Sequence, residues 1–214
     1  MRILVMTNGE YGDPGWYGPQ RESFDRVICV DGGTTWAMRL GMVPDRVVGD
    51  LDSISPEALD YAAGHGAEFT VVPREKDNTD TQLALELAER DGATGVVIWG
   101  GTGSRLDHSL SNLFSASSLV LKGIAVQFAS PREDIYLIDR SLVLPARVGE
   151  TVSLIALGDE ALGVTLSGFK YPLFDARING RWQHAVSNVV VAENPAVRVA
   201  SGVLAVIHYR ELPE

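Results

Sequence analysis

The stretch RVICVDGGTTWAMRLGMVPDRVVGDLDS, residues 26–53, decides the fold class of this chain. It holds two short apolar runs, RVICV and RVVG, and between them a segment with the spacing of a helix. Apolar strands separated by helices are typical of a parallel α/β sheet. Each run is followed by aspartate, at Asp31 and at Asp50 and Asp52. In an open parallel sheet the ligand crevice lies outside the carboxyl ends of the strands, so these carboxylates are expected to converge there.

The alternation of strands and helices extends through the first 130 residues. Strands are expected at residues 2–7, 26–30, 45–48, 68–72, 94–99 and 124–129. Helices are expected at residues 33–41, 55–64, 79–91 and 106–121. We therefore predict an amino-terminal, Rossmann-like α/β domain with a parallel sheet over residues 1–130.

The pattern changes after residue 130, where short β-branched runs are separated by turn signals. Asn179-Gly180 and Ser201-Gly202 are hairpin cues between apolar runs. These features predict an antiparallel all-β sandwich domain over residues 131–214. The expected fold class is therefore α/β followed by all-β.

The composition argues against several classes of partner. Lysine and arginine number 18 against 28 aspartates and glutamates, a formal charge of −10, which argues against nucleic acid or an anionic membrane. No run approaches the ~20 apolar residues that span a membrane. The start, MRILVMTNGE, fits a strand better than a signal peptide, and a cytoplasmic location is expected. The one cysteine, Cys29, lies in an apolar run and is expected to be a buried structural thiol.

The segment Gly49-Asp50-Leu51-Asp52-Ser53 predicts a pair of carboxylates on one side of the chain. In extended backbone, residues two apart point to the same face, so Asp50 and Asp52 would form a clamp while Leu51 points away. Mg²⁺ prefers oxygen ligands and usually combines one or two carboxylates with substrate phosphates, so the first interpretation is a Mg²⁺-nucleotide site. The alternative is a solvated loop that contains two acids.

A second segment, GGTGSRLDH at residues 100–108, follows a predicted strand and opens the next helix. Its glycines allow backbone amides to approach an anion, and Arg105 can make forked hydrogen bonds to phosphate. It lacks the Gly-Lys-Ser/Thr ending of a Walker A loop and the spacing of the dinucleotide fingerprint. A flexible glycine-rich turn is the alternative. His108 could carry a proton or anchor the loop, and the anchor is favoured because phosphoryl transfer relies mainly on positioning and electrostatics.

Two further segments extend the same crevice. KDNTD adds two acids, Asp77 and Asp80, and Lys76, which either joins the site or is simply solvated. Asn78 is expected to cap the helix that follows, and Asp80 taken alone would be a stabiliser of its first turn. In VDGG the glycines permit close backbone approach, and Asp31 either bonds to nucleotide or caps a helix.

Taken in order, VDGG, GDLDS, KDNTD, GGTGSRLDHSLSNL, GFKYPL and VSN resemble the motifs of the thiamine pyrophosphokinase family over nearly all of the chain. The resemblance implies an ATP-binding α/β domain and a thiamine-binding β-sandwich, paired in a homodimer whose sites form between subunits. It also implies transfer of the β,γ-pyrophosphoryl group of ATP to the hydroxyethyl group of thiamine, which leaves AMP. Mg²⁺ is the implied cofactor.

The matching positions imply roles for individual residues. Mg²⁺ is expected at Asp50, Asp52 and Asp80, and thiamine at Ser187 and Asn188. The implied catalytic set is Asp50, Asp52, Asp77, Asp80 and Arg105, in which either Asp77 or Asp80 orients or deprotonates the hydroxyl. The implied ATP-binding set is Asp31, Gly32, Gly33, Lys76, Thr79, Gly101, Thr102, Gly103, Ser104, Arg105, Asp107 and His108. Ser104 departs from the family pattern, which often has a second Gly-Gly pair before the arginine.

Two other functions stay open at this point. An enzyme of the same architecture could pyrophosphorylate another hydroxymethyl heterocycle, such as a pterin, and only the β-rich part would distinguish the two. A non-catalytic module could bind nucleotide or metal and transfer nothing. Release of AMP in the presence of thiamine separates these alternatives.

Overall fold

The structure is a computed structural model, and it describes residues 1–73, 75, 77–103, 105–182 and 184–210. The strands of the first part of the chain are β1 (Arg2–Met6), β2 (Arg26–Val30), β3 (Arg46–Gly49), β4 (Glu68–Val71), β5 (Gly95–Trp99) and β6 (Ala125–Ala129). Its helices are the 3-10 helix η1 (Pro14–Ser23) and the α-helices α1 (Gly33–Leu40), α2 (Pro56–Gly64), α3 (Asp80–Arg90) and α4 (Leu106–Val120). The strands of the second part are β7 (Glu133–Ile138), β8 (Ser141–Val143), β9 (Thr151–Ala156), β10 (Glu160–Ser167), β11 (Ala176–Asn179), β12 (Asn188–Val189), β13 (Ala196–Arg198) and β14 (Leu204–Tyr209).

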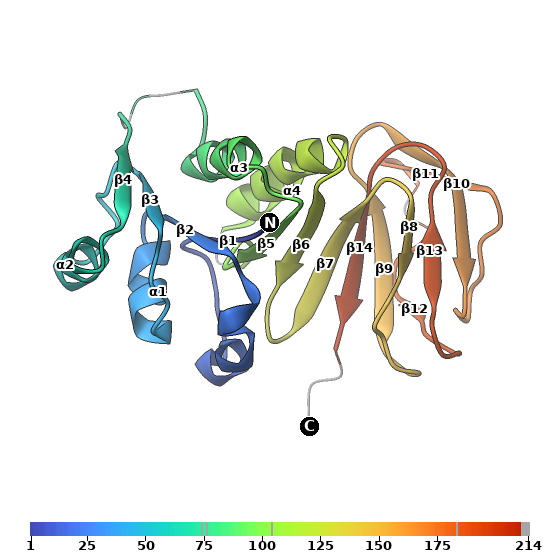
Figure 1. Cartoon of the computed structure of the whole chain (residues 1–214). Coiled ribbons are helices and arrows are strands. Elements are labelled where there is room, and N and C mark those ends of the chain that lie inside the picture. The colour runs from blue at the N-terminus through green and yellow to red at the C-terminus, as the bar shows by residue number, and fades with distance from the viewer. Residues whose placement is uncertain (74, 76, 104, 183, 211–214) are drawn as a thin grey trace.

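The strands of the first part form a parallel sheet in the order β6-β5-β1-β2-β3-β4 (Figure 1). These strands and the helices α1 to α4 agree with the predicted ranges to within one residue at each end, so the α/β prediction is confirmed. The 3-10 helix η1 was not predicted. It begins at Pro14 and is capped by Asp13, whose Oδ1 accepts a hydrogen bond from the amide of Gly15 (2.9 Å). A 3-10 helix has three residues per turn, so its apolar spacing differs from that of an α-helix.

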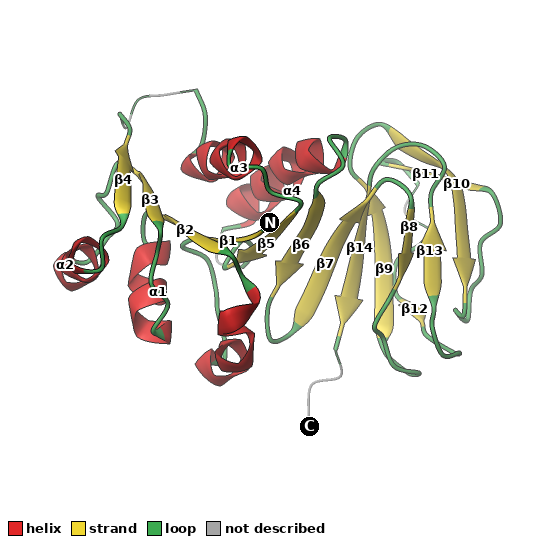
Figure 2. Ribbon diagram, viewed as in Figure 1, coloured by secondary structure: helices red, strands yellow, loops and turns green. Residues whose placement is uncertain are grey.

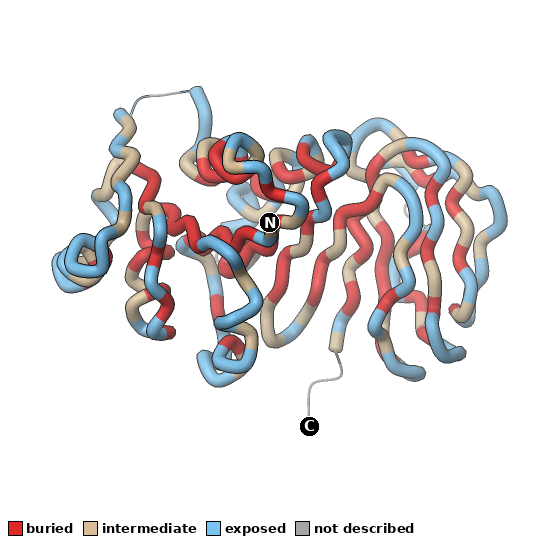
Figure 3. The backbone as a smooth tube through the Cα atoms, viewed as in Figure 1, coloured by how far each residue is buried: buried red, intermediate tan, exposed pale blue. Residues whose placement is uncertain are grey.

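The parallel strands other than the edge strand β4 are buried on both faces along most of their length (Figure 3). Helices α3 and α4 cover one face, and α1, α2 and η1 cover the other (Figure 2). Along β1, Ile3 and Val5 pack on the first side while Leu4 and Met6 pack on the second, and all four are 0% exposed. A strand covered on both sides is apolar at every position, which explains why this run shows no alternation with polar residues.

The second part of the chain adds β7, β14, β9 and β12 to the same sheet with antiparallel pairing. A second sheet, β11-β10-β13-β8, packs over this extension. The core between the sheets includes Leu154 and Val206 from the large sheet and Leu166 and Val197 from the small one. The predicted β-rich second part is confirmed. Because β6 and β7 pair with each other, the large sheet continues across the expected boundary, and a domain division at residue 130 stays a prediction.

The two hairpin predictions have different outcomes. Ser201-Gly202 does not join paired strands, because β13 lies in the small sheet and β14 in the large one. The chain crosses between the sheets there, and Gly202 (φ +89°) packs so closely on β10 that a Cβ would lie 2.4 Å from a carbonyl oxygen. The reversal at Asn179-Gly180 is confirmed, because Asn179 and Trp182 form an isolated antiparallel bridge in which the Trp182 amide donates to the Asn179 carbonyl (3.1 Å). Strand β11 also pairs with β10. A turn signal marks where the chain reverses but does not select the partner of the next segment.

The expectation of a buried thiol is confirmed, since Cys29 is 0% exposed within β2. Burial raises the pKa of this thiol, so it packs as a small apolar group and is a poor nucleophile. In the described part of the chain, no helix has both the length and the apolar character needed to cross a lipid bilayer.

Candidate functional site

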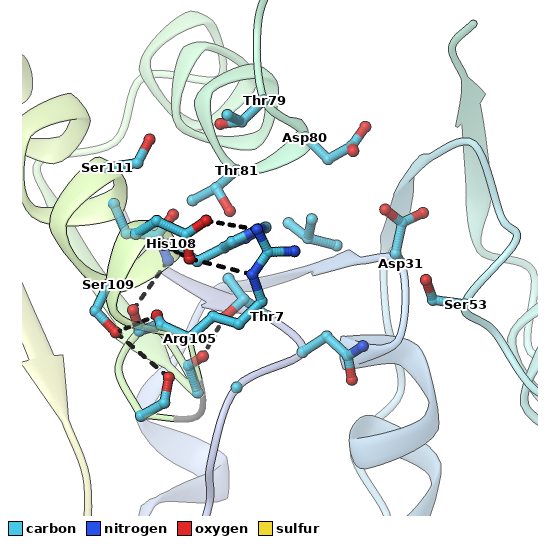
Figure 4. A pocket seen from close by; sticks show the side chains of 18 residues that line it. Thr7, Asp31, Ser53, Thr79, Asp80, Thr81, Arg105, His108, Ser109 and Ser111 are labelled. Carbon is cyan, nitrogen blue, oxygen red and sulfur yellow. Dashed lines mark hydrogen bonds and ion pairs between the residues drawn. The ribbon is translucent and has the colours of Figure 1, made fainter. Parts of the chain in front are cut away.

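A pocket of about 590 Å³ lies at the carboxyl edge of the parallel sheet, between the ends of β1, β2 and β5 and the starts of α3 and α4 (Figure 4). It has an acidic side after β2 and at the start of α3, and a glycine-rich side with an arginine at the start of α4. The described lining residues are Thr7, Asn8, Gly9, Val30, Asp31, Ser53, Thr79, Asp80, Thr81, Gly100, Gly101, Gly103, Arg105, Asp107, His108, Ser109, Ser111 and Asn112. The loops that follow separate strands therefore converge on one crevice, as a parallel sheet requires.

Asp31 and Asp80 form the acidic side and face each other across a short gap (Figure 4). Asp31 has a positive φ of +42°, and its Oδ1 accepts a hydrogen bond from the amide of Leu51 (3.2 Å). Gly49 makes room for this oxygen, since a Cβ there would lie 1.8 Å from it. Burial, the carboxylate of Asp80 and then that of Asp50 raise the pKa of Asp31 to about 6. Facing carboxylates of this kind favour a proton or a cation between them.

The predicted clamp of Asp50 and Asp52 on one face of an extended strand is wrong. Strand β3 ends at Gly49, and Leu51 has a φ of +67°, so the backbone turns between the two aspartates. The amide of Asp52 donates to Oδ1 of Asp50 (3.1 Å), and Ser53 Oγ donates to Oδ1 of Asp52 (2.9 Å). Ser53 lines the pocket, whereas neither aspartate is among the described lining residues. Asp50 is nevertheless close enough to Asp31 to act on its pKa.

The described residues contain no group of three or more His, Cys, Asp or Glu side chains arranged to hold a metal ion by themselves. A Mg²⁺ ion does not require such a cage, because it is commonly held by one or two carboxylates, substrate phosphates and water. The facing pair of Asp31 and Asp80 supplies oxygen donors of the right chemistry. The protein side of a magnesium site in this pocket would therefore be incomplete until a phosphate ligand arrives.

Thr79, not Asn78, caps α3. Thr79 Oγ1 accepts from the amide of Gln82 (3.2 Å), and Gln82 Oε1 accepts from the amide of Thr79 (2.8 Å). Asn78 instead donates its side-chain amide to Glu86 (3.3 Å). This reciprocal capping box fixes the first turn and places the carboxylate of Asp80 at the pocket, where the helix amino terminus also favours negative charge.

The basic side is formed by Arg105, which stands at the amino end of α4. Its guanidinium makes a forked ion pair with Asp107, with Nε 3.1 Å from Oδ1 and Nη2 2.5 Å from Oδ2 (Figure 4). This pairing lowers the pKa of Asp107 to about 2, and it raises the pKa of Arg105. His108 also lines the pocket, and its amide donates to Asp107 Oδ1 (3.0 Å). Both partners of the ion pair are about two-thirds exposed, so the guanidinium lies where an entering phosphate can reach it.

Not every residue that the sequence indicated lines the pocket. Gly101 and Gly103 do, whereas Thr102, Asp77, Gly32 and Gly33 are not among its described lining residues. The two glycines of VDGG serve the packing of α1 on β1: a Cβ on Gly32 would lie 2.4 Å from the side chain of Asn8, and one on Gly33 would lie 2.1 Å from the carbonyl oxygen of Met6. The predictions for Lys76 and Ser104 fall on positions outside the described residues.

Several lining residues were missed. Thr7, Asn8 and Gly9 directly follow β1, and the rule that selected the loops after the other strands would have found them. Asn112 lies on the face of α4 that packs toward the sheet, and a polar residue on an otherwise apolar helix face could have indicated it. Ser109 and Ser111 carried no such signal, since serine is common in exposed helical turns.

Ser187 and Asn188 lie in the β-rich part and not at this pocket. Asn188 is 3% exposed, and its side chain holds the backbone of Tyr171: Oδ1 accepts from the amide (3.0 Å) and Nδ2 donates to the carbonyl (2.7 Å). Ser187 has a φ of +59°, and its amide donates to Oγ of Ser153 (2.9 Å). Large aromatic side chains are exposed in the same part of the chain, among them Tyr171 at 59% and Trp182 at 72%. Asn188 thus supports a surface loop that carries one of these rings.

Comparisons with known proteins agree with the resemblance found in the motifs. The family description "Thiamin pyrophosphokinase, catalytic domain" matches residues 20–128, and "Thiamin pyrophosphokinase, vitamin B1 binding domain" matches residues 138–204. Thiamine pyrophosphokinase from Bacillus subtilis is 29% identical, over 84% of this chain and 85% of the relative, and thiamine pyrophosphokinase 1 from Oryza sativa is 26% identical, over 81% and 74%. The crystal structure of the Bacillus subtilis thiamine pyrophosphokinase superposes with a TM-score of 0.84 at 25% identity, covering 99% of this chain and 100% of that one. These matches show that the chain belongs to the thiamin pyrophosphokinase family of enzymes.

Proposed function

We propose that this chain performs the thiamine pyrophosphokinase reaction of its family as a Mg²⁺-dependent transfer of the pyrophosphoryl group of ATP to the hydroxyethyl group of thiamine, with AMP as the second product. One observation carries the chemical part of the proposal: a carboxylate pair, Asp31 and Asp80, lies across a single pocket from Arg105 and a glycine loop. Arg105 and the glycine loop can bind the negatively charged polyphosphate from one side of the pocket. The carboxylates can hold, on the other side, a cation that also contacts the phosphates.

The acidic side fits a hard divalent cation. Asp80 lines the pocket, and Asp50 and Asp52 belong to the turn whose backbone also holds Asp31, so we propose that these three aspartates hold Mg²⁺, in part through water. The bound ion would offset the repulsion between the phosphate groups and the carboxylates of these three residues and of Asp31. The raised pKa of Asp31, caused first by burial and then by Asp80, supports a cation there because the uncompensated pair repels.

The glycine loop and Arg105 are proposed to bind the transferred group. Backbone amides at the start of α4 favour anions, and the fork of Arg105 matches phosphate oxygens. To bind phosphate, the guanidinium would exchange at least one of its bonds to Asp107 for a bond to the nucleotide. Of the two candidate bases, Asp80 is favoured over Asp77 because only Asp80 lines the pocket.

We propose a homodimer in which two chains share each site, with residues 1–130 as the ATP-binding domain and residues 131–214 as the thiamine-binding domain. The described lining of the nucleotide pocket lies wholly between residues 7 and 112, while the vitamin B1 binding domain of the family matches residues 138–204. A second copy would bring its β-rich part, with Ser187 and the exposed aromatic side chains, to the side of the pocket where thiamine is proposed to bind.

Mixing two inactive chains tests the shared site. Asp52→Asn removes a proposed metal ligand, and Ser187→Trp blocks the proposed thiamine side. A mixed dimer contains one site with two intact halves, so we expect part of the activity to return on mixing. Failure of mixed chains to regain activity, once heterodimers are shown by native mass spectrometry, would mean that each chain builds its site alone.

The reaction itself is tested with purified chain, ATP, Mg²⁺ and a panel of thiamine and pterin alcohols, with AMP and the pyrophosphorylated product both measured. We expect AMP and thiamine diphosphate in equal amounts and no product from a pterin alcohol. A pterin product would assign the chain to another acceptor. Binding of ATP without AMP release under any condition would identify a non-catalytic module.

A further inference from the structure

The carbonyl groups of the glycine loop are held by donors from outside the loop. Three consecutive carbonyl oxygens, those of residues 100–102, each accept a hydrogen bond, in turn from Thr7 Oγ1, from Asn112 Nδ2 (2.9 Å) and from the amide of Glu10 (3.2 Å). Ser109 Oγ lies 3.4 Å from the Gly103 carbonyl oxygen but closer, at 3.0 Å, to that of Arg105. These donors come from the end of β1, the loop after it and the first two turns of α4. The loop is therefore fixed from two different elements.

Fixing these carbonyls also fixes the amides. A trans peptide is planar, so the carbonyl of one residue and the amide of the next point in opposite directions. The amides of Gly101 and Gly103 therefore point away from Thr7 and Glu10, and the amide of Thr102 points away from Asn112. In the described part of the chain none of these three amides donates a hydrogen bond to the protein. Gly101 and Gly103 line the pocket, so their amides are the donors that this loop can offer to an anion there.

Among these donors, Asn112 is the residue least expected at its position. It is 7% exposed and lies on the face of α4 that continues as Ala116 and Leu119, both in the apolar core toward the sheet. An apolar residue would be expected at that position, because asparagine has a lower helix propensity and its buried amide costs free energy unless it is bonded. The bond to Gly101 compensates for this cost.

The neighbouring residues prevent Gly101 from moving away from Asn112. A Cβ on Gly101 would lie 2.6 Å from Cγ2 of Ile98 and 2.7 Å from the ring of Phe128, so the backbone is already in close contact with the core. The Gly101 peptide is therefore held between the buried side chains of Ile98 and Phe128 and the side-chain amide of Asn112. Rotation of this peptide plane is the movement that loss of the hydrogen bond would allow.

We infer that Asn112 is a positioning residue for nucleotide binding: it holds the Gly101 carbonyl and so fixes the course of the glycine loop, whose residues Gly101 and Gly103 line the pocket. Thr7 acts in the same way on the preceding carbonyl. The inference rests on the proposed function only in that the loop binds the polyphosphate of ATP. The alternative is a purely structural bond that ties α4 to the sheet.

Asn112→Leu and Asn112→Asp test the inference. Leucine removes the donor with little change in size, and aspartate places an acceptor against the Gly101 carbonyl. We expect the Kd of Mg-ATP, measured by titration calorimetry, and the Michaelis constant for ATP to rise roughly tenfold in Asn112→Leu and further in Asn112→Asp. The Michaelis constant for thiamine should stay within twofold of wild type. Thr7→Val should reproduce the defect from the other side of the loop.

Ser117→Ala is the matched control, since Ser117 lies on α4 and donates to a carbonyl of its own helix (2.6 Å), away from the loop. It should leave ATP binding unchanged. Wild-type ATP affinity in both Asn112 variants, or a loss that affects ATP and thiamine equally and follows the fall in melting temperature, would overturn the inference. If the Asn112 variants fail to fold, Thr7→Val with unaltered ATP affinity would overturn it as well. Calorimetry needs no turnover, so a chain that binds ATP but releases no AMP would contradict the proposed function and leave this test valid.

Discussion

Replacing Asp31 by asparagine should stabilise the fold at neutral pH and impair the reaction. The side chain is half-buried and faces Asp80, and its Oδ1 accepts from the amide of Leu51. Asparagine keeps an acceptor oxygen for that bond and has nearly the same volume, but it carries no charge. The substitution therefore removes the repulsion within the carboxylate pair and leaves the local packing in place.

The magnitude follows from the pKa of Asp31. Burial first, and Asp80 second, raise it from 3.8 to about 6. At about 1.4 kcal/mol for each unit, the ionised form costs the folded state at most about 3 kcal/mol. Solvent screens a half-exposed carboxylate, so about 1 kcal/mol is the realistic gain for Asp31→Asn. For a chain of this size that gain raises the melting temperature by about 2–4 °C.

The pH dependence gives the sign of the effect. A folded-state pKa above the unfolded one means that protonated Asp31 stabilises the fold at low pH, and this contribution is lost as the pH rises through about 6. The gain in the free energy of unfolding of Asp31→Asn over wild type should therefore be small at pH 4 and reach its full value at pH 7. Urea unfolding followed by circular dichroism, with a chelator present, measures the difference. A gain that is equal at pH 4 and pH 7, or a loss of stability at pH 7, would refute the reasoning. Asp159→Asn, an exposed site in the β-rich part, is the control.

Three further predictions follow. Arg105→Lys keeps the charge but loses the fork, so the Michaelis constant should rise for ATP and stay near wild type for thiamine; an unchanged constant for ATP would remove Arg105 from the site. Ser187→Ala should raise the Michaelis constant for thiamine by less than about tenfold, as expected for one neutral hydrogen bond, with ATP affinity from calorimetry as the control. Glu150→Ala leaves His208 (2.7 Å away, 2% exposed) without its buried partner and should lower the free energy of unfolding by about 3 kcal/mol. Burial opposes ionisation of Glu150, but bonds from the Arg147 amide and His208 outweigh it and lower its pKa, so the wild-type advantage should disappear as the pH falls through that pKa.

The elements around the pocket could be predicted because their signals are local. Strand β1 is apolar at each of its four buried positions, and α3 and α4 have apolar residues at helical spacing. A parallel sheet then brings the following loops together. On that basis Asp31, Asp80 and Arg105 were all placed at one crevice, where the structure also has them. The partner of each strand in the β-rich part was harder to predict, because pairing there depends on contacts distant in sequence. Residues 201–202, for example, join strands of two different sheets.

The shape of the backbone at the site could not be predicted from residue types. Asp50-Leu51-Asp52 was expected to be extended, but Leu51 takes a positive φ, which few residues of its type adopt. Asn188 stays a proposed thiamine residue from its position in a motif, and the residue types did not indicate that its side-chain amide holds the backbone of Tyr171. In both cases the outcome depends on a hydrogen-bond partner that no local pattern specifies.

Backbone strain in this chain is concentrated where the chemistry is proposed. Among the described residues, positive φ outside glycine occurs at Asp31, Leu51, Asp175, Ser187 and Asn194. Asp31 lies at the acidic side of the pocket, Leu51 donates its amide to Asp31, and Ser187 is one of the residues expected at thiamine. Such conformations cost of order 1–3 kcal/mol each and persist only where the surroundings hold them. At Asp31 the surroundings are the Leu51 amide and the space left by Gly49, so the strained backbone and the repelling carboxylates occupy the same few residues. A bound cation can relieve the repulsion but not the strain, and the buried parallel strands on either side must therefore hold the site in shape before any ligand arrives.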